Sequence, residues 1–460
     1  MNTEEITLQQ PIQTESIIII DSLNNPNTET IETNEINIIN EPTEINIINE
    51  TIEINIQDNQ YNQLNPETNT ETNKQKIQNL FTKITNAKFV SEEGLDNLKY
   101  YKYSGEDKSL LVKYCLAPFF WNPLVKKLPL WLAPNLITLF GGLCMLLALF
   151  AVQFTMEPQD TPSLIVNIFC SLMIFLYQTA DNLDGKQARR TQSSSALGEL
   201  FDHGVDAIMV GIFGMIISMN MQLSCCEILS MFLVLNIVFY LSHWEEYYVG
   251  TLVLGYIVNP TELQYMTIFY LLFQALFPEI GTFSIMSFMI NEYCFFIMII
   301  LSFFTIVSYI WGIYRWSRNN NKSFSECLSK LTQYTMFIIF SFALVFCINN
   351  ALEKTFVFWT ITYIIIIVNA YLTQRLVVKR ICKEDVPLSD PILIVYVVFV
   401  IILSYFGMTN NLVMIVISSL VLLCIVFGFE VALVKDICNA FCERLGIRVF
   451  KIKVPENNEN

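Results

Sequence analysis

Acidic side chains and one histidine are concentrated in a single short stretch of the chain. Between Asp181 and Asp206 the sequence reads DNLDGKQARRTQSSSALGELFDHGVD, with four aspartates, a glutamate and a histidine. Apolar runs lie on both sides, IVNIFCSLMIFLYQTA before it and AIMVGIFGMIISM after it. Because ionisable groups at the edge of a membrane are costly and usually functional, this stretch is the first candidate for a reactive site.

The aspartates recur at the spacing of an α-helix, on which residues three, four and seven apart share one side. Two such stripes are present, one on each side of a short turn at 191–195: Asp181, Asp184 and Ala188, and then Gly198, Asp202 and Asp206. Two helices joined by so short a turn can face each other. We therefore expect the four carboxylates to converge on one point.

Converging carboxylates repel one another in a medium of low dielectric and need a cation between them. Hard oxygen ligands select Mg²⁺, Mn²⁺ or Ca²⁺. Gly185 and Gly198 leave room for a bulky group near the backbone, and Arg189 offers a planar fork suited to phosphate. The alternative is a solvated loop whose acids pair with Lys186, Arg189 and Arg190, but helical spacing of the whole set favours a metal and phosphate site.

The elements that must position these residues are membrane helices, as the composition indicates. Of 460 residues, 53% are hydrophobic and 15% charged, which is typical of an all-α polytopic membrane protein. The net charge of -15 comes mostly from residues 1–80, which hold 14 acids and 2 lysines, so no nucleic-acid-binding surface is expected. The twelve cysteines lie mostly in or beside apolar runs and predict membrane thiols rather than disulfides.

We expect about ten membrane spans. Basic residues precede the first expected span and follow the second, sixth, eighth and tenth, whereas the opposite loops carry only Lys354. By the positive-inside rule the acidic stretch and both termini then lie in the cytosol. The expected spans are 135–154, 162–180, 205–221, 226–243, 264–277, 293–314, 334–348, 355–373, 391–407 and 411–433.

Composition divides the chain into four regions. Residues 1–80 form an acidic, low-complexity arm, expected to be disordered, with EINIIN at 35–40 and again at 44–49. Residues 81–130 interleave Tyr, Trp, Phe and Lys, which predicts a helical segment in the membrane interface. Residues 131–435 are the expected transmembrane catalytic domain, and 436–460 a cytosolic tail.

The pattern D-x2-D-G-x2-A-R-x8-G-x3-D-x3-D, which begins at Asp181, resembles the signature of the CDP-alcohol phosphotransferase family at every fixed position. The flanking blocks YQTADNLDGKQARRT, GELFDHGVD, LPLWLAPNLITLFGG and HWEEYYVGTLVLG resemble its eukaryotic choline/ethanolamine phosphotransferase branch. The resemblance covers about 95–435 and leaves out the arm. One departure is Asn259, where the branch pattern has glycine.

The resemblance implies an enzyme that transfers phosphocholine or phosphoethanolamine from CDP-choline or CDP-ethanolamine to diacylglycerol and releases CMP. It implies two Mg²⁺ or Mn²⁺ ions, a multi-pass location in the endoplasmic reticulum or Golgi membrane, and a homodimer. His203 would be the proton acceptor, with Glu199 orienting it and Asp206 as the alternative base. The implied metal ligands are Asp181, Asp184, Asp202 and Asp206, and the implied nucleotide-binding residues are Asn135, Gly185, Ala188, Arg189 and Gly198.

Three other functions are compatible with parts of the pattern. Another lipid or alcohol acceptor would keep the same site. A cation transporter would place its acids at the middle of the membrane on broken helices, not at the edge. A prenyltransferase would need a second acidic motif, and the later expected spans contain none.

Overall fold

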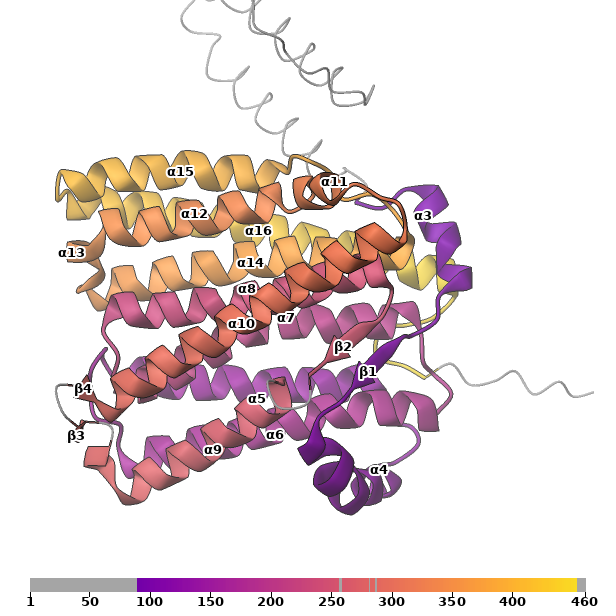
Figure 1. Cartoon of the computed structure of the whole chain (residues 1–460), viewed down its shortest axis with the longest axis horizontal. Helices are drawn as coiled ribbons and strands as arrows, with labels where there is room; N and C mark the ends of the chain where they lie inside the picture. Colours follow the sequence, from indigo (N-terminus) through magenta and orange to yellow (C-terminus); the bar gives the residue numbers. More distant parts are fainter. Residues whose placement is uncertain (1–88, 256–258, 281, 286–287, 453–460) are drawn as a thin grey trace, which may run out of the picture. The chain divides into compact units, whose positions relative to one another are not determined.

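Long antiparallel helices make up most of the described chain (Figure 1). The computed structural model describes residues 89–452, apart from 256–258, 281 and 286–287. The expectations for residues 1–80 and for the end of the tail lie outside these residues. The long helices are α5 (Pro134–Thr155), α6 (Leu164–Arg190), α7 (Ala196–Asn220), α8 (Cys225–Val249), α9 (Pro260–Leu276), α10 (Ile290–Asn319), α12 (Thr332–Cys347), α14 (Thr355–Cys382), α15 (Pro391–Met408) and α16 (Leu412–Leu445).

Short elements connect or flank these helices. β1 pairs with β2 in a parallel two-stranded sheet, and β3 pairs with β4 in an antiparallel one. The short elements are α3 (Glu92–Asn97), the 3₁₀ helix η1 (Leu98–Tyr100), β1 (Gly105–Asp107), the π-helix η2 (Val112–Trp121), α4 (Asn122–Lys127), β2 (Leu252–Leu254), the 3₁₀ helix η3 (Pro278–Ile280), β3 (Ser284–Ile285), β4 (Phe288–Met289), α11 (Phe324–Ser329) and α13 (Asn349–Leu352).

Each of the ten expected spans overlaps one long helix of the structure. Within the described residues, eight helices are long and apolar enough to cross a membrane, which makes the chain a multi-pass membrane protein. The other two, α9 and α12, have 17 and 16 residues and are shorter than a typical span. The expected domain boundary at residue 435 falls inside α16, which continues to Leu445.

Helix α7 lies at the centre of the helical packing. It contacts α5, α6, α8, α14 and α16. In the most apolar 18-residue stretch of α7, 67% of the residues are buried, against 11% in the corresponding stretch of α10. Helix α10 instead exposes apolar side chains, Phe303 and Phe304 among them. Surface exposure of this kind is expected where a helix faces lipid, so α7 is an inner helix and α10 an outer one.

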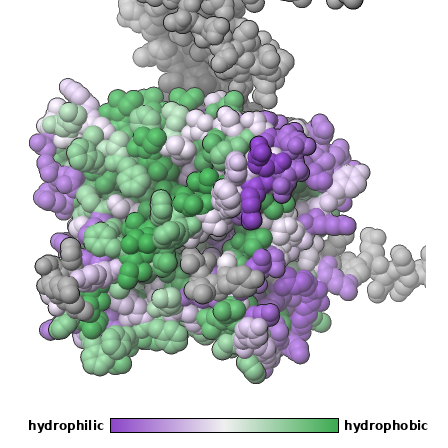
Figure 2. Space-filling view, viewed as in Figure 1, coloured by the Kyte–Doolittle hydropathy of each residue, from purple (hydrophilic) through white to green (hydrophobic). Residues whose placement is uncertain are grey.

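Polar residues gather toward one end of the helices. Figure 2 shows apolar side chains across the middle of one face and hydrophilic ones toward the end where α3 lies. Successive long helices run in opposite directions, so α6 ends and α7 begins at this same end (Figure 1). The basic clusters of the sequence lie at this end too, whereas Lys354 lies at the other, just before α14.

The turn between α6 and α7 brings the two halves of the acidic stretch together. Helix α6 ends at Arg190, and Gln192 takes a left-handed conformation with φ of 54°. Ser195 then caps α7, and its hydroxyl accepts a hydrogen bond from the Gly198 N–H at 3.1 Å. The turn is therefore as short as the sequence predicts, and the start of α7 returns beside the end of α6.

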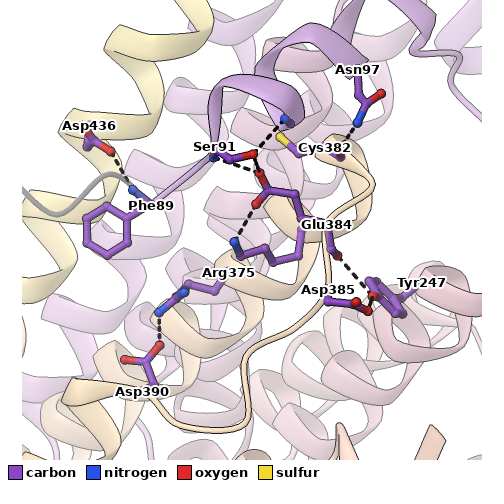
Figure 3. Close-up of polar contacts among 12 residues, drawn as sticks. Phe89, Ser91, Asn97, Tyr247, Arg375, Cys382, Glu384, Asp385, Asp390 and Asp436 are labelled. Carbon is purple, nitrogen blue, oxygen red and sulfur yellow. Dashed lines mark hydrogen bonds and ion pairs between the residues drawn. The ribbon is translucent and has the colours of Figure 1, made fainter. Parts of the chain in front are cut away.

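A cluster of polar contacts fastens α3 to the ends of α14 and α16 (Figure 3). The backbone N–H and the hydroxyl of Ser91 both donate to Glu384, at 2.8 and 2.5 Å. The ammonium of Lys379 pairs with the other oxygen of Glu384 at 2.6 Å. The N–H of Phe89 donates to Asp436 on α16 at 3.2 Å. The first described residues are thus held against helices formed some 300 residues later.

Candidate active site

Three of the four aspartates converge as the sequence predicts. One carboxylate oxygen from each of Asp181, Asp202 and Asp206 lies within 4.8 Å of the others. Asp181 comes from the last turns of α6, and Asp202 and Asp206 come from α7. The Tyr177 hydroxyl donates to Asp206 at 2.7 Å. The cluster is therefore built across the α6–α7 turn.

Asp184 lies beside this group, and its oxygens have partners on the protein. The carboxylate interacts electrostatically with Asp202 and Asp206. One of its oxygens accepts from the Thr138 hydroxyl on α5 at 2.5 Å, and the other accepts from the Gly185 N–H at 2.5 Å. Asp184 is thus buried and fixed by α5, a helix outside the acidic stretch.

The cluster fits divalent metal ions. Its donor set is made of carboxylate oxygens, which Mg²⁺ and Mn²⁺ prefer. Among the described residues, Asp202 Oδ1 is buried and accepts no hydrogen bond from the protein. A buried carboxylate oxygen without a donor is costly, and a bound cation would satisfy it.

The two adjacent arginines at the end of α6 have different surroundings. Arg190 donates to the carbonyls of Val125 and Leu128, at 2.9 and 2.6 Å, and so anchors α4. The guanidinium of Arg189 instead lies over Gly185, where a β-carbon would come within 3.5 Å of it. Arg189 is exposed and lies one helical turn from Asp184 and Gly185.

Two of the remaining expected nucleotide residues, Asn135 and Gly198, lie at the starts of α5 and α7. A β-carbon on Gly198 would lie 3.9 Å from Asn135 Oδ1, so these two residues are neighbours. The amide of Asn135 donates to the Val449 carbonyl at 2.8 Å. The segment after α16 therefore reaches the start of α5, which the sequence did not predict. Ala188 is partly buried on α6, between Asp184 and the turn.

His203 is buried on α7, one residue after Asp202. Glu199 lies one turn earlier and interacts with it electrostatically. The carboxylate of Glu199, however, receives its hydrogen bonds from the Arg380 guanidinium on α14 and the Tyr101 hydroxyl. The expected Glu199–His203 pair is therefore part of a larger set of contacts that sequence spacing does not contain.

A segment from the N-terminal side crosses this part of the site. After Tyr101, the chain continues through Tyr103 to β1, which pairs with β2 beyond the end of α8. The Tyr103 side chain is 55% exposed, and its phenol interacts electrostatically with the carboxylates of Asp202 and Glu199. A phenol is protonated at neutral pH, so Tyr103 is a hydrogen-bond donor beside the acids. Both tyrosines lie in the sequence YKYSGED at 101–107, which the expected site residues did not include.

The site has the features of a membrane enzyme that acts on a phosphorylated substrate. These are an acidic cluster, an arginine and a buried histidine at the polar end of membrane helices. The model of the CDP-alcohol phosphatidyltransferase family matches residues 131–311, which include the whole acidic stretch. An uncharacterized CDP-alcohol phosphatidyltransferase class-I family protein 2 of Dictyostelium discoideum is 31% identical over 376 residues, covering 81% of this chain and 90% of the relative. The chain belongs to the CDP-alcohol phosphatidyltransferase class-I family.

Other relatives are more similar over a shorter region. Choline/ethanolaminephosphotransferase 2 of Arabidopsis thaliana is 43% identical over 176 residues, 38% of this chain and 44% of the relative. Cholinephosphotransferase 1 of Xenopus laevis is 37% identical over 206 residues, 43% of this chain and 49% of the relative. These matches span less than half of the relatives' length.

Proposed function

We propose that this enzyme transfers phosphocholine or phosphoethanolamine from a CDP-alcohol to diacylglycerol. The observation that carries the proposal is the convergence of Asp181, Asp202 and Asp206, with Asp184 beside them, at the polar end of α6 and α7. The relatives named choline/ethanolaminephosphotransferase and cholinephosphotransferase support this choice of substrates.

The chemistry requires one bond to form and one to break at phosphorus. The hydroxyl oxygen of diacylglycerol bonds to the β-phosphorus, and the bond from that phosphorus to the bridging oxygen breaks, so that CMP leaves. The hydroxyl proton passes to a ring nitrogen of His203, because a neutral imidazole is a suitable base near pH 7. Two divalent ions, Mg²⁺ or Mn²⁺, held by the four aspartates would neutralise the charge of the pyrophosphate.

The remaining residues bind and orient the nucleotide. Arg189 offers two parallel donors to a phosphate, and the missing side chain of Gly185 lets the phosphate approach the helix. Gly198 and Asn135, which adjoin each other, form with Ala188 the surface that receives the cytidine. Tyr103 adds a donor from the segment that crosses the site.

The position of the acids suits substrates from two phases. The nucleotide reaches the polar end of the helices from water, and diacylglycerol arrives from the bilayer. Exposed aromatic side chains lie in the segment that precedes α5, with Phe119 on η2 78% exposed and Trp131 76% exposed. Such side chains favour the headgroup level, in keeping with an interfacial role for residues 81–130.

The clustering of basic residues at the end that carries the acids supports a cytosolic active site. The endoplasmic reticulum or Golgi location implied by the family resemblance belongs to the same proposal. The homodimer implied by the family resemblance belongs to the same proposal, and light scattering of the purified protein tests it.

Activity of the purified protein tests the proposal directly. Detergent-solubilised enzyme is supplied with diacylglycerol, Mg²⁺ or Mn²⁺, and either labelled CDP-choline or labelled CDP-ethanolamine. We expect labelled phosphatidylcholine or phosphatidylethanolamine, with CMP in equal amount, and no product from the Asp202→Asn variant. Folded wild-type protein that makes neither lipid but accepts another alcohol would assign a different acceptor to the same site.

A further inference from the structure

A second cluster of ionisable side chains adjoins His203 and lies outside the acidic stretch. One donor atom from each of His203, His243 and Glu246 lies within 4.8 Å of the others, and all three residues are buried. His243 and Glu246 come from the last two turns of α8, the helix that packs against α7. The phosphotransfer chemistry described above gives these two residues no role.

The contacts of His243 hold its ring in one orientation. Its Nδ1 is 3.1 Å from Glu246 Oε2. Its ring and that of Phe239 form a T-shaped pair with centroids 4.7 Å apart, and the His203 ring packs against it with centroids 4.8 Å apart. A carboxylate on one nitrogen fixes the tautomer and the plane of an imidazole, as it does in serine hydrolases and at metal-bound histidines. His243 is therefore a fixed surface for the His203 ring.

One guanidinium joins this cluster to Glu199. Arg380 on α14 lies with Nη1 3.3 Å from Glu246 Oε1, and its other terminal nitrogen pairs with Glu199. Each oxygen of Glu246 thus has a partner, one in Arg380 and one in His243. Because a protein cation already occupies this cluster, the contacts favour a hydrogen-bonded network over a metal site.

His203 itself has less support than its neighbours. Its Nδ1 is buried and has no hydrogen-bond partner among the described residues. Packing against the His243 ring is therefore a contact that restrains the tilt of the His203 imidazole. A general base must lie within hydrogen-bond reach of the proton it removes, so a tilted ring would lose rate without losing substrate binding.

We propose that His243 and Glu246 are positioning residues that hold the His203 ring in its working orientation, with Arg380 as the counter-ion shared by Glu246 and Glu199. The proposal rests on the proposed function, because it takes His203 as the proton acceptor. It assigns a task to the HWEEY block of α8, through a network that connects α7, α8 and α14.

Neighbouring glutamates on α8 provide a matched comparison. Glu246→Gln keeps the size of the side chain but weakens its bonds to Arg380 and His243. Glu245→Gln is the control, because the Glu245 carboxylate lies against Gly312 of α10 instead. We expect Glu246→Gln to lower kcat about ten- to 100-fold, with KM for the CDP-alcohol within about twofold. Glu245→Gln should keep both constants within about twofold.

A double-mutant cycle separates positioning from general damage to the protein. If Glu246 acts through His203, then Glu246→Gln added to His203→Ala causes no further loss of kcat. Equal losses in the presence and absence of His203 would overturn the proposal, as would an unchanged kcat in Glu246→Gln. Near-wild-type turnover of His203→Ala would instead overturn the base assignment in the proposed function, and the positioning role with it.

Two further measurements keep the test decisive. Stabilisation by the CDP-alcohol in a thermal melt shows whether each variant retains a folded nucleotide site. Should Glu246→Gln fail to fold, His243→Gln gives the same cycle with His203→Ala. Metal content of the wild-type protein is measured beside that of His243→Gln, and one bound zinc per chain that the variant lacks would make the cluster a metal site and overturn the proposal.

Discussion

Asp184 differs from the other aspartates of the site in having protein donors on both oxygens. Asp202 has the opposite surroundings, because its Oδ1 is buried with no donor among the described residues. The two carboxylates therefore have different requirements for a cation. Asp184 is fixed by α5 without an ion, whereas a bound cation would satisfy Asp202.

Substitution of the cluster aspartates should abolish transfer. Asp181→Asn or Asp202→Asn removes a charged oxygen ligand, and we expect turnover below about 1% of wild type, because such ligands hold the ions that stabilise the transferred phosphate. Chelation with EDTA should inhibit the wild type, and added Mg²⁺ or Mn²⁺ should restore it. Asp160→Asn, in the α5–α6 loop at the opposite end, is the control. Full wild-type activity in excess EDTA would contradict a metal-dependent site.

The identity of the base is a separate prediction. His203→Ala should lower kcat about 10²- to 10⁴-fold, the usual contribution of a general base, and leave CDP-alcohol binding nearly intact. Binding is measured by thermal stabilisation and kcat by CMP release. If His203→Ala keeps most of its turnover, while Asp206→Asn binds metal but is inactive, Asp206 is the base.

Sequence spacing predicted the aspartates but not the contacts that surround them. Residues three and four apart on a helix adopt neighbouring positions by geometry alone. The contact between Glu199 and Arg380, by contrast, joins residues 181 positions apart. Only the packing of α14 against α7 brings them together, and no local pattern encodes which helices pack.

At the scale of elements, several helices end beyond the expected ends of their membrane spans. The expected spans stop where the apolar run stops, but α6, α14 and α16 continue into polar sequence. Helix α14 ends only where Lys383 takes a left-handed conformation with φ of 55°. Hydropathy therefore locates the membrane part of a helix, whereas local turn conformation sets its end.

The contacts of Glu384 that hold α3 against the end of α14 offer a pH-dependent test at this scale. Burial acts to raise the pKa of Glu384, but hydrogen bonds from Lys379 and Ser91 outweigh it, and the pKa lies below its ordinary value. A carboxylate whose pKa is lowered in the folded protein stabilises the fold fully at a pH above its pKa in the unfolded chain, about 4.3. This stabilisation is lost as the pH falls through the pKa of the folded state. Glu384→Gln should therefore cost ~1–3 kcal/mol at pH 7 and progressively less below about pH 4.

Thermal melts in detergent across pH 3.5–8 measure this difference. Asp385→Asn is the matched control, because its side chain is 88% exposed and its substitution should change stability by less than about 0.5 kcal/mol. A stability loss in Glu384→Gln that is equal at every pH would contradict the ionic role of Glu384.

At the scale of the whole molecule, the N-terminal arm and α3 should differ in importance. Deletion of residues 1–80 should leave turnover nearly unchanged, because the arm is low in complexity and carries no motif. Deletion of residues 1–100 also removes Ser91 and α3, and we expect a loss of more than about tenfold. The assay is CMP release by folded protein. A loss of that size in the shorter deletion would show that the arm assists catalysis.

The ten-span arrangement makes a prediction about sidedness. Asn320→Cys, at the end of α10, should react with an impermeant maleimide in sealed microsomes, and Asn410→Cys, between α15 and α16, should not. The background protein lacks the exposed thiols of Cys115 and Cys424. Labelling of both positions, or protection of both, would contradict ten spans.

The contacts of Ser91 and Asn135 also constrain how the enzyme is made. Their partners, Glu384 and Val449, follow them by 293 and 314 residues. A ribosome adds residues in order, so both early residues leave it long before these partners exist. Arg380, the partner of Glu199, is likewise translated near the end. A chain that ends before residue 380 therefore lacks the partners of Ser91, Asn135 and Glu199.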